Sequence, residues 1–120
     1  MLVDDNADSV EVLEATFRAC GAGTVAAQNV PTALSYLDTG WFDVIVSELA
    51  LPGRDGVDLI RALRKRRGSE RAMPAIALTG YREQYDDVAL DAGFDAYLRK
   101  PVDLDALCLK VRALVDEQRR

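Results

Sequence analysis

The hydrophobic positions along the chain follow two periodicities that alternate five times. Short apolar runs typical of buried strands occur at 1–3, 24–27, 42–47, 75–79 and 96–99. Each run is followed by a segment in which apolar residues recur every three or four positions, at about 8–20, 29–40, 57–67, 86–92 and 103–115. Alternating strands and helices predict an α/β fold, with a doubly wound parallel sheet covered by helices on both faces.

Polar residues and glycines mark where these helices begin and end. Asp8 and Glu11 have the spacing of a capping box and predict the start of the first helix, which Gly21 ends. Asn29 is expected to cap the second helix, with Pro31 in its first turn.

Composition and charge narrow the classes of function. The chain has 120 residues, enough for one domain with its own core. Its net charge of -5 argues against direct binding of nucleic acid, and no apolar run approaches the length of a membrane span. The absence of histidine excludes His-ligated metals, Ser-His-Asp catalysis and a phosphohistidine donor within this chain.

The cysteines and the first residues bear on the cellular compartment of the protein and on the origin of the chain. Cys20 and Cys108 are isolated, lie in predicted helices and lack CxxC spacing. They are interpreted as two small buried thiols of a reduced, cytoplasmic protein. Only three residues precede the acids Asp4 and Asp5, so we expect no signal peptide, a shortened first strand and an origin in a longer protein.

Chemically active residues gather where the predicted strands end. Asp4 and Asp5 follow the first strand, Glu48 the third, Thr79 ends the fourth and Lys100 follows the fifth. Ligands of open parallel sheets bind beyond the carboxyl ends of the strands, where the strand order reverses. Three carboxylates without His or Cys favour a hard cation, Mg²⁺ above all. A hydroxyl and an ammonium group opposite the metal suit a phosphoryl group.

These motifs resemble those of a known family. Asp4-Asp5-Asn6, the segment 42–56 with Leu-Pro-Gly-x-Asp-Gly, Thr79 and Lys100-Pro101 are similar to response-regulator receiver domains, the CheY-like superfamily of two-component phosphorelay signalling. The resemblance covers residues 1–120 as a single receiver domain. It implies a flavodoxin-like three-layer sandwich with five helices and strand order 2-1-3-4-5. The segments 75–80 and 93–101 look most like receivers of hybrid sensor kinases.

The resemblance also implies a set of metal-binding residues. Asp4 and Asp5 would bind Mg²⁺, with Asp5 the more direct ligand. Glu48 stands at the phosphoacceptor position and would be a further ligand, and Ala50 would offer its backbone carbonyl.

Three further residues would respond to a phosphoryl group. Thr79 would donate a hydrogen bond to it, Lys100 would pair with one of its oxygens, and Tyr97 would be the rotameric switch. The Lys100–Pro101 peptide is expected to be cis, as is usual in the family.

The family also implies partners and a mode of action. Expected partners are a histidine kinase or phosphotransfer protein, and an output domain or effector, with a homodimer as an open alternative. The chain itself is expected to be no enzyme, although the parent protein could be a hybrid histidine kinase.

Glu48 is the departure from the family, which has aspartate at this position. Asp43 lies at the other end of its strand and Asp55 belongs to the next turn, so neither can replace it. Glu is one methylene longer, and two interpretations stay open. Glu48 could imitate a phosphorylated aspartate in part, or it could occupy the site so that the domain neither accepts phosphate nor switches.

Other functions remain as alternatives. The main one is a phosphorylation-independent interaction module that uses the fourth helix, fifth strand and fifth helix, with Tyr97, Arg99 and Arg112 on its surface. A Mg²⁺-dependent phosphatase is more remote because the D-x-D spacing is missing after the first strand, and a flavin-binding electron carrier is disfavoured by the Asp4-Asp5 pair. The basic residues between 61 and 71 are interpreted as a solvated helix end, or else as a docking surface.

Overall fold

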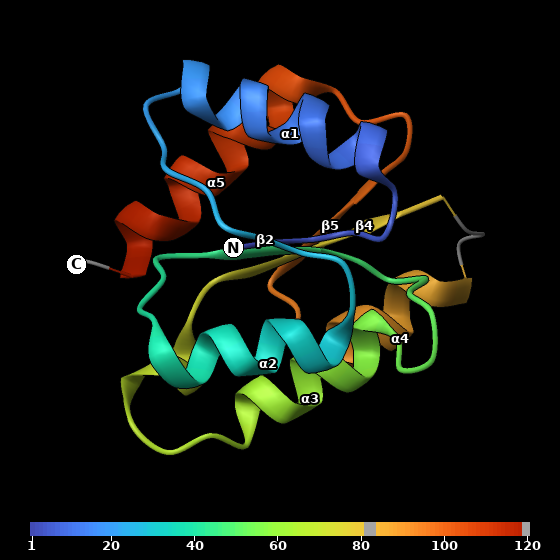
Figure 1. Cartoon of the computed structure of the whole chain (residues 1–120), viewed down its shortest axis with the longest axis vertical. Coiled ribbons are helices and arrows are strands. Elements are labelled where there is room, and N and C mark those ends of the chain that lie inside the picture. The colour runs from blue at the N-terminus through green and yellow to red at the C-terminus, as the bar shows by residue number, and fades with distance from the viewer. Residues whose placement is uncertain (81–83, 119–120) are drawn as a thin grey trace.

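The computed structural model describes residues 1–80 and 84–118, and its middle layer is a parallel sheet with strand order β2-β1-β3-β4-β5 (Figure 1). The strands are β1 (Leu2–Val3), β2 (Ala26–Ala27), β3 (Ile45–Glu48), β4 (Ala75–Thr79) and β5 (Ala96–Arg99). Both the strand order and the parallel pairing are as the sequence predicts.

Helices cover both faces of the sheet. α1 (Ala7–Ala19) and α5 (Leu104–Gln118) lie side by side on one face, and α2 (Val30–Thr39), α3 (Gly56–Arg64) and α4 (Gln84–Ala92) lie on the other (Figure 1). A 3₁₀ turn, η1 (Ser69–Ala72), precedes β4. The layers follow from right-handed crossovers between parallel strands, which change face where the strand order reverses at β1.

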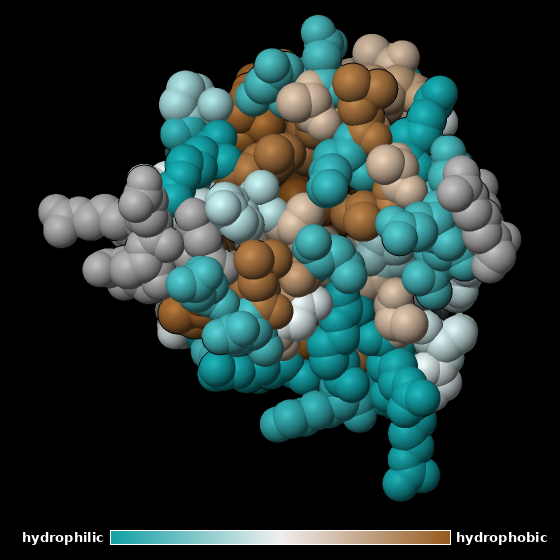
Figure 2. Space-filling view, turned by 180° about the vertical axis from the view of Figure 1, so that it is seen from behind, coloured by the Kyte–Doolittle hydropathy of each residue, from teal (hydrophilic) through white to brown (hydrophobic). Residues whose placement is uncertain are grey.

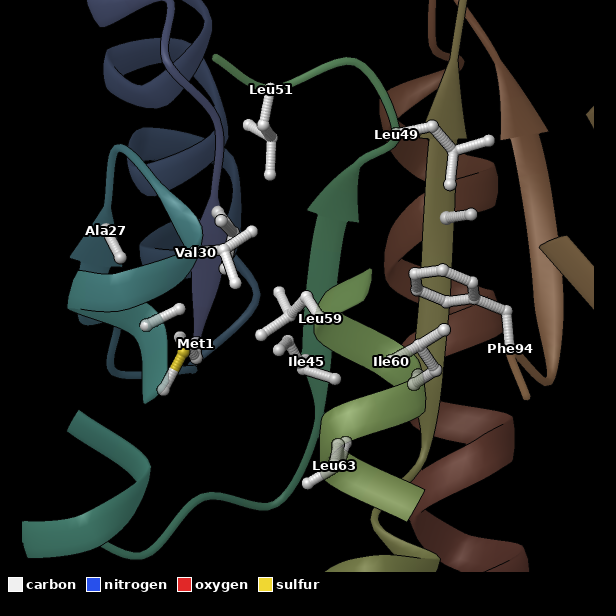
Figure 3. Packing of buried hydrophobic residues seen from close by; sticks show 14 of the residues in the cluster. Met1, Ala27, Val30, Ile45, Leu49, Leu51, Leu59, Ile60, Leu63 and Phe94 are labelled. Carbon is white, nitrogen blue, oxygen red and sulfur yellow. The ribbon is translucent and has the colours of Figure 1, made fainter. Parts of the chain in front are cut away.

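Alternate residues of each strand belong to two separate hydrophobic cores, one on each face of the sheet. On β4, Ile76 and Leu78 belong to the core beneath α1 and α5, together with Phe17 of α1. Ala75 and Ala77 belong to the core beneath α2, α3 and α4. Figure 3 shows the second core, where Val30, Ile45, Leu49, Leu51, Leu59, Ile60, Leu63 and Phe94 pack together. The central strands are therefore covered on both faces, which explains their nearly continuous apolar sequence.

The register of the sheet determines which residues share its carboxyl edge. Val3 is paired with Ser47, Glu48 with Leu78, and Thr79 with Arg99. Because the pairs are parallel, the residues just after Val3, Ser47, Leu78 and Arg99 emerge at one edge of the sheet.

Helix capping is as expected for α2 and different for α1. The Asn29 side chain accepts a hydrogen bond from the Thr32 amide at 2.8 Å, as predicted. The predicted Asp8–Glu11 capping box is wrong, because the helix starts two residues earlier and Asn6 is the N-cap, accepting from the Ser9 amide. Asn and Asp are both favourable N-cap residues, so local preference alone does not choose between Asn6 and Asp8.

The interpretation of the cysteines as isolated buried thiols is wrong. Cys20 caps the C-terminus of α1, Cys108 lies in α5, and the two form a disulfide with a Cα–Cα distance of 6.7 Å. The residues are 88 positions apart in the sequence, and only the packing of α1 against α5 brings them together. Cys20 is exposed and Cys108 half-buried, which also differs from the expected burial.

Two arginines of the basic segment 61–71 have partners within the fold. The Arg64 guanidinium donates to the carbonyl oxygens of Gly93 and Met73 and pairs with Asp95. Arg66 pairs with Asp38 and Glu70. These contacts tie α3 to its neighbours, so this part of the basic segment serves the fold rather than a free docking surface.

The outer surface differs between the two helical layers. Seen from behind, hydrophobic side chains gather in the upper half, on the side of α1 and α5, and the lower half is mainly hydrophilic (Figure 2). Across the described residues, no helix combines the length and the apolar character needed to cross a membrane.

Candidate functional site

Three charged side chains meet at the carboxyl edge of the sheet. The Lys100 ammonium lies 2.7 Å from Glu48 Oε2 and 3.2 Å from Asp4 Oδ2. Asp4 is 2% exposed and Glu48 6%, whereas the Lys100 side chain is 30% exposed. One cation thus stands between two buried carboxylates contributed by β1 and β3.

The backbone positions each member of this triad. Asp4 follows β1 directly, and its Oδ1 accepts a hydrogen bond from the Asn6 amide at 2.9 Å. The Lys100 amide donates to the Thr79 carbonyl at 2.9 Å, which extends the β4–β5 pairing by one residue. The Lys100–Pro101 peptide is cis, as the family resemblance implies.

The loop after β3 holds the Glu48 carboxylate. Glu48 Oε1 accepts a hydrogen bond from the Ala50 amide at 3.2 Å. Within the described residues Oε2 accepts no hydrogen bond of regular geometry, so its contact with Lys100 is an ion pair. The backbone therefore holds one oxygen of the Glu48 carboxylate, and the charge of Lys100 compensates the other.

Close packing explains why the Leu-Pro-Gly-x-Asp-Gly motif ends in glycine, at Gly56. A Cβ at this position would lie 2.5 Å from the Glu48 carbonyl oxygen and 3.0 Å from Leu49 Cα. The Gly56 amide also donates to the Leu49 carbonyl at 2.8 Å. Asp55 in the same motif caps α3 by accepting from the Asp58 amide. The motif therefore closes the loop tightly against the backbone of Glu48.

Electrostatics favour the charged form of Lys100. Burial lowers the pKa of Lys100, but the attraction of Glu48, with a further contribution from Asp4, outweighs the effect of burial. The pKa of Lys100 is therefore raised above its ordinary value. The ammonium is the permanent counter-ion of the two carboxylates at neutral pH.

Asp5 differs from Asp4 in its exposure to solvent. Its side chain is exposed, whereas that of Asp4 is buried. Among residues 1–80 and 84–118, no three acidic or other metal-ligating side chains form a group that could hold a metal ion. In this arrangement Lys100 lies between Asp4 and Glu48 and compensates their charge.

The other residues predicted from the sequence lie on β4, β5 and α5. Thr79 ends β4 and is fully buried beside Lys100, to which its carbonyl is hydrogen-bonded. Tyr97 is half-buried on β5, and the Arg99 guanidinium lies 6.0 Å from the centre of its ring. Arg112 on α5 is exposed. Ala50 contributes its amide to Glu48, and this contact was not among the roles expected from the sequence.

Asp43 and Asp55 have other roles in the fold. Asp43 precedes β3 and acts electrostatically on the Met1 ammonium, which donates to the Val44 carbonyl at the amino edge of the sheet. Asp55 caps α3. Glu48 is therefore the acid that β3 delivers to the triad, as the sequence register predicts.

Comparisons with known proteins agree with this architecture. A family model described as response regulator receiver domain matches residues 1–112. An uncharacterised 14.6 kDa protein of Leptolyngbya boryana is 40% identical over 104 residues, covering 86% of this chain and 79% of that protein. The response regulator protein PmrA of Pseudomonas aeruginosa is 43% identical over 91 residues, 75% of this chain but 37% of PmrA.

A solved structure shares the fold over nearly the whole chain. The receiver domain of the sensor histidine kinase PA1611 of Pseudomonas aeruginosa superimposes with a TM-score of 0.88 at 29% identity, covering 96% of this chain and 94% of that one. That structure holds a magnesium ion in its active-site cleft.

Proposed function

The chain belongs to the family of response regulator receiver domains, and from this premise we propose that it is a phosphorelay receiver module in which Glu48 replaces phosphorylation. The observation that carries the proposal is the 2.7 Å ion pair between Glu48 and Lys100. The lysine expected to meet a phosphoryl oxygen is already bound to a carboxylate.

The geometry supports a site that is closed to phosphotransfer. In-line attack on a phosphodonor needs an aligned carboxylate oxygen. Glu48 Oε1 is held by the Ala50 amide and Oε2 by Lys100. Both oxygens thus have partners, and the added methylene would carry the carboxylate toward the space that a phosphoryl group needs.

Partial imitation of the phosphorylated form is the favoured consequence of this ion pair. A carboxylate supplies one negative charge, compared with about 1.5 to 2 for a phosphoryl group, and fewer acceptor oxygens. The pairing of Lys100 with Glu48 would stand in for its pairing with a phosphoryl oxygen, while Thr79 and Tyr97 would respond more weakly.

Weak Mg²⁺ binding is a further part of the proposal. Asp4, Asp5, Glu48 and the Ala50 carbonyl would hold the ion, and its bound charge would supply electrostatic neutralisation of the acids. Because Lys100 already compensates Asp4 and Glu48, we expect weaker Mg²⁺ binding than in the Glu48→Asp variant, in which the shorter carboxylate withdraws from Lys100.

The module would act by binding partners in the cytoplasm and not as an enzyme. Its partners would be a histidine kinase or phosphotransfer protein, and an output domain or effector in the same or another polypeptide. A groove of about 340 Å³ between α1 and the turn after β5 reaches Lys100 and offers such a partner an apolar surface.

Phosphorylation by a small donor tests this function. The chain and its Glu48→Asp variant are incubated with Mg²⁺ and acetyl phosphate, and hydroxylamine-labile phosphate is measured by mass spectrometry. We expect label on the aspartate variant alone. Ready labelling of the unaltered chain would overturn the proposal, and a Mg²⁺ titration that shows equal affinity for both chains would overturn the part that concerns the metal.

A further inference from the structure

A covalent link fastens the last helix to the first. Cys20 at the end of α1 and Cys108 in α5 form the disulfide, and these are the two cysteines of the sequence. With no third thiol to exchange with, the pair has one intramolecular oxidised form and one reduced form.

The link lies where a small thiol or disulfide can reach it. Cys20 is exposed, and both cysteines line a groove of about 970 Å³ at the amino edge of the sheet. Exposed disulfides are the ones that exchange readily with small thiols, whereas deeply buried ones resist reduction. In Figure 1 the end of α1 lies at the left, whereas the loop that follows β3 lies at the right.

α5 depends on this link more than a well-buried helix would. Leu107 is its fully buried residue among those described, while Leu109 on the same helix is 70% exposed. Leu104, Val111 and Leu114 are only partly buried against the core beneath α1. A helix held by so few buried side chains gains much from a cross-link that closes a loop of 88 residues.

We propose that Cys20 and Cys108 form a reversible thiol–disulfide switch that controls how firmly α5 is held against α1. The inference concerns the amino edge of the sheet and does not rest on the role of Glu48. Because disulfides are rare and transient in reducing compartments, reduction would be the resting state in a cytoplasm and oxidation the signal.

The exchange needs a small-molecule disulfide, and oxidised glutathione is the class intended. The Cys20 thiolate attacks one glutathione sulfur, forms a mixed disulfide and releases one glutathione thiolate. The Cys108 thiolate then attacks the Cys20 sulfur, closes the protein disulfide and releases the second glutathione. The two cysteines lose two electrons and two protons, which leave with the two reduced glutathiones.

The experiment compares oxidised and reduced forms of the whole chain. The protein is equilibrated with oxidised or with reduced glutathione, free thiols are counted by alkylation and mass spectrometry, and thermal unfolding is recorded. We expect no free thiol in the oxidised form, two in the reduced form, and a midpoint about 10 °C lower after reduction. Amide hydrogen exchange should accelerate in α5 on reduction and stay unchanged in α3.

Serine variants serve as controls. Cys20→Ser and Cys108→Ser cannot form the internal disulfide. Their unfolding midpoints should therefore be nearly the same in oxidised and in reduced glutathione, apart from any small effect of glutathione attached to the remaining cysteine. Stable glutathione adducts on both cysteines of the unaltered chain, or equal exchange of α5 in both forms, would overturn the switch. The unaltered chain gives this answer even if a serine variant folds poorly.

Discussion

Removing the Lys100 ammonium tests the charge arrangement of the site most directly. The substitution Lys100→Met keeps most of the length of the side chain and deletes its charge. It leaves the Asp4 and Glu48 carboxylates, which are 2% and 6% exposed, without their shared counter-ion. The structure therefore predicts that Lys100→Met lowers the free energy of unfolding, and that this loss is smaller when Glu48 is also neutralised.

The magnitude follows from burial and distance. Breaking a buried ion pair by removing one partner costs about 3–5 kcal/mol. Lys100 is 30% exposed, so solvent already screens part of the interaction and we expect a cost of about 2–4 kcal/mol. Most of this loss of free energy should come from the pair with Glu48, because the Lys100 ammonium lies 2.7 Å from Glu48 Oε2 and 3.2 Å from Asp4 Oδ2.

A double-mutant cycle isolates this share. Lys100→Met, Glu48→Gln and the double variant are unfolded in urea at neutral pH and low salt. If the ion pair is real in solution, the double variant loses about 2 kcal/mol less than the sum of the single variants. Lys110→Met, which removes an exposed lysine of α5, is the matched control and should cost less than about 0.5 kcal/mol.

The result that refutes the reasoning is additivity. If the coupling free energy between positions 48 and 100 is below about 0.5 kcal/mol, Lys100 is solvated and the premise of the proposed function fails. The pH dependence gives an independent check. Since the pKa of Lys100 is raised in the folded state, its contribution should be fully present below about pH 10 and disappear as the pH rises through the folded pKa.

Two further predictions concern the loop and the amino terminus. Gly56→Ala should lower the free energy of unfolding by about 1–3 kcal/mol, because its Cβ would meet the Glu48 carbonyl oxygen at 2.5 Å, whereas Gly23→Ala has nothing within 4 Å; equal urea midpoints for the two variants would contradict this packing. Burial lowers the pKa of the Met1 ammonium from 8.0 to about 6, although Asp43 raises it, so the folded state holds fewer protons between those values. The free energy of unfolding of the 120-residue polypeptide should therefore rise with pH across that window, by at most about 3 kcal/mol. Urea unfolding at about pH 5.5 and about pH 8.5 measures the rise. The sequence has no histidine to obscure it, and an N-acetylated chain with the same rise would contradict the assignment.

The elements and their order could be predicted from the sequence alone. The strand ranges 75–79 and 96–99 match β4 and β5, and Asn29 caps α2 as expected. Such features depend on neighbours within a few positions, namely side-chain periodicity and local capping hydrogen bonds. Strand-end motifs also identified the edge of the sheet at which Glu48 and Lys100 meet.

Partners distant in sequence were decided by the tertiary structure. Asp4 and Lys100 are 96 positions apart, and their approach depends on the register of four strands. The sequence named Asp4 and Asp5 together as metal ligands and did not show that Asp4 is buried and Asp5 exposed. Cys20 and Cys108 looked isolated until α1 packed against α5.

The amino-acid sequence thus determined the fold, the family and the unusual acid at position 48, because these are encoded in local patterns. Only the tertiary structure decided which cation compensates that acid. Charge pairing in a buried site depends on distances of a few ångströms between segments that the sequence places far apart. The Lys100 ammonium between Asp4 and Glu48 is the outcome of that geometry.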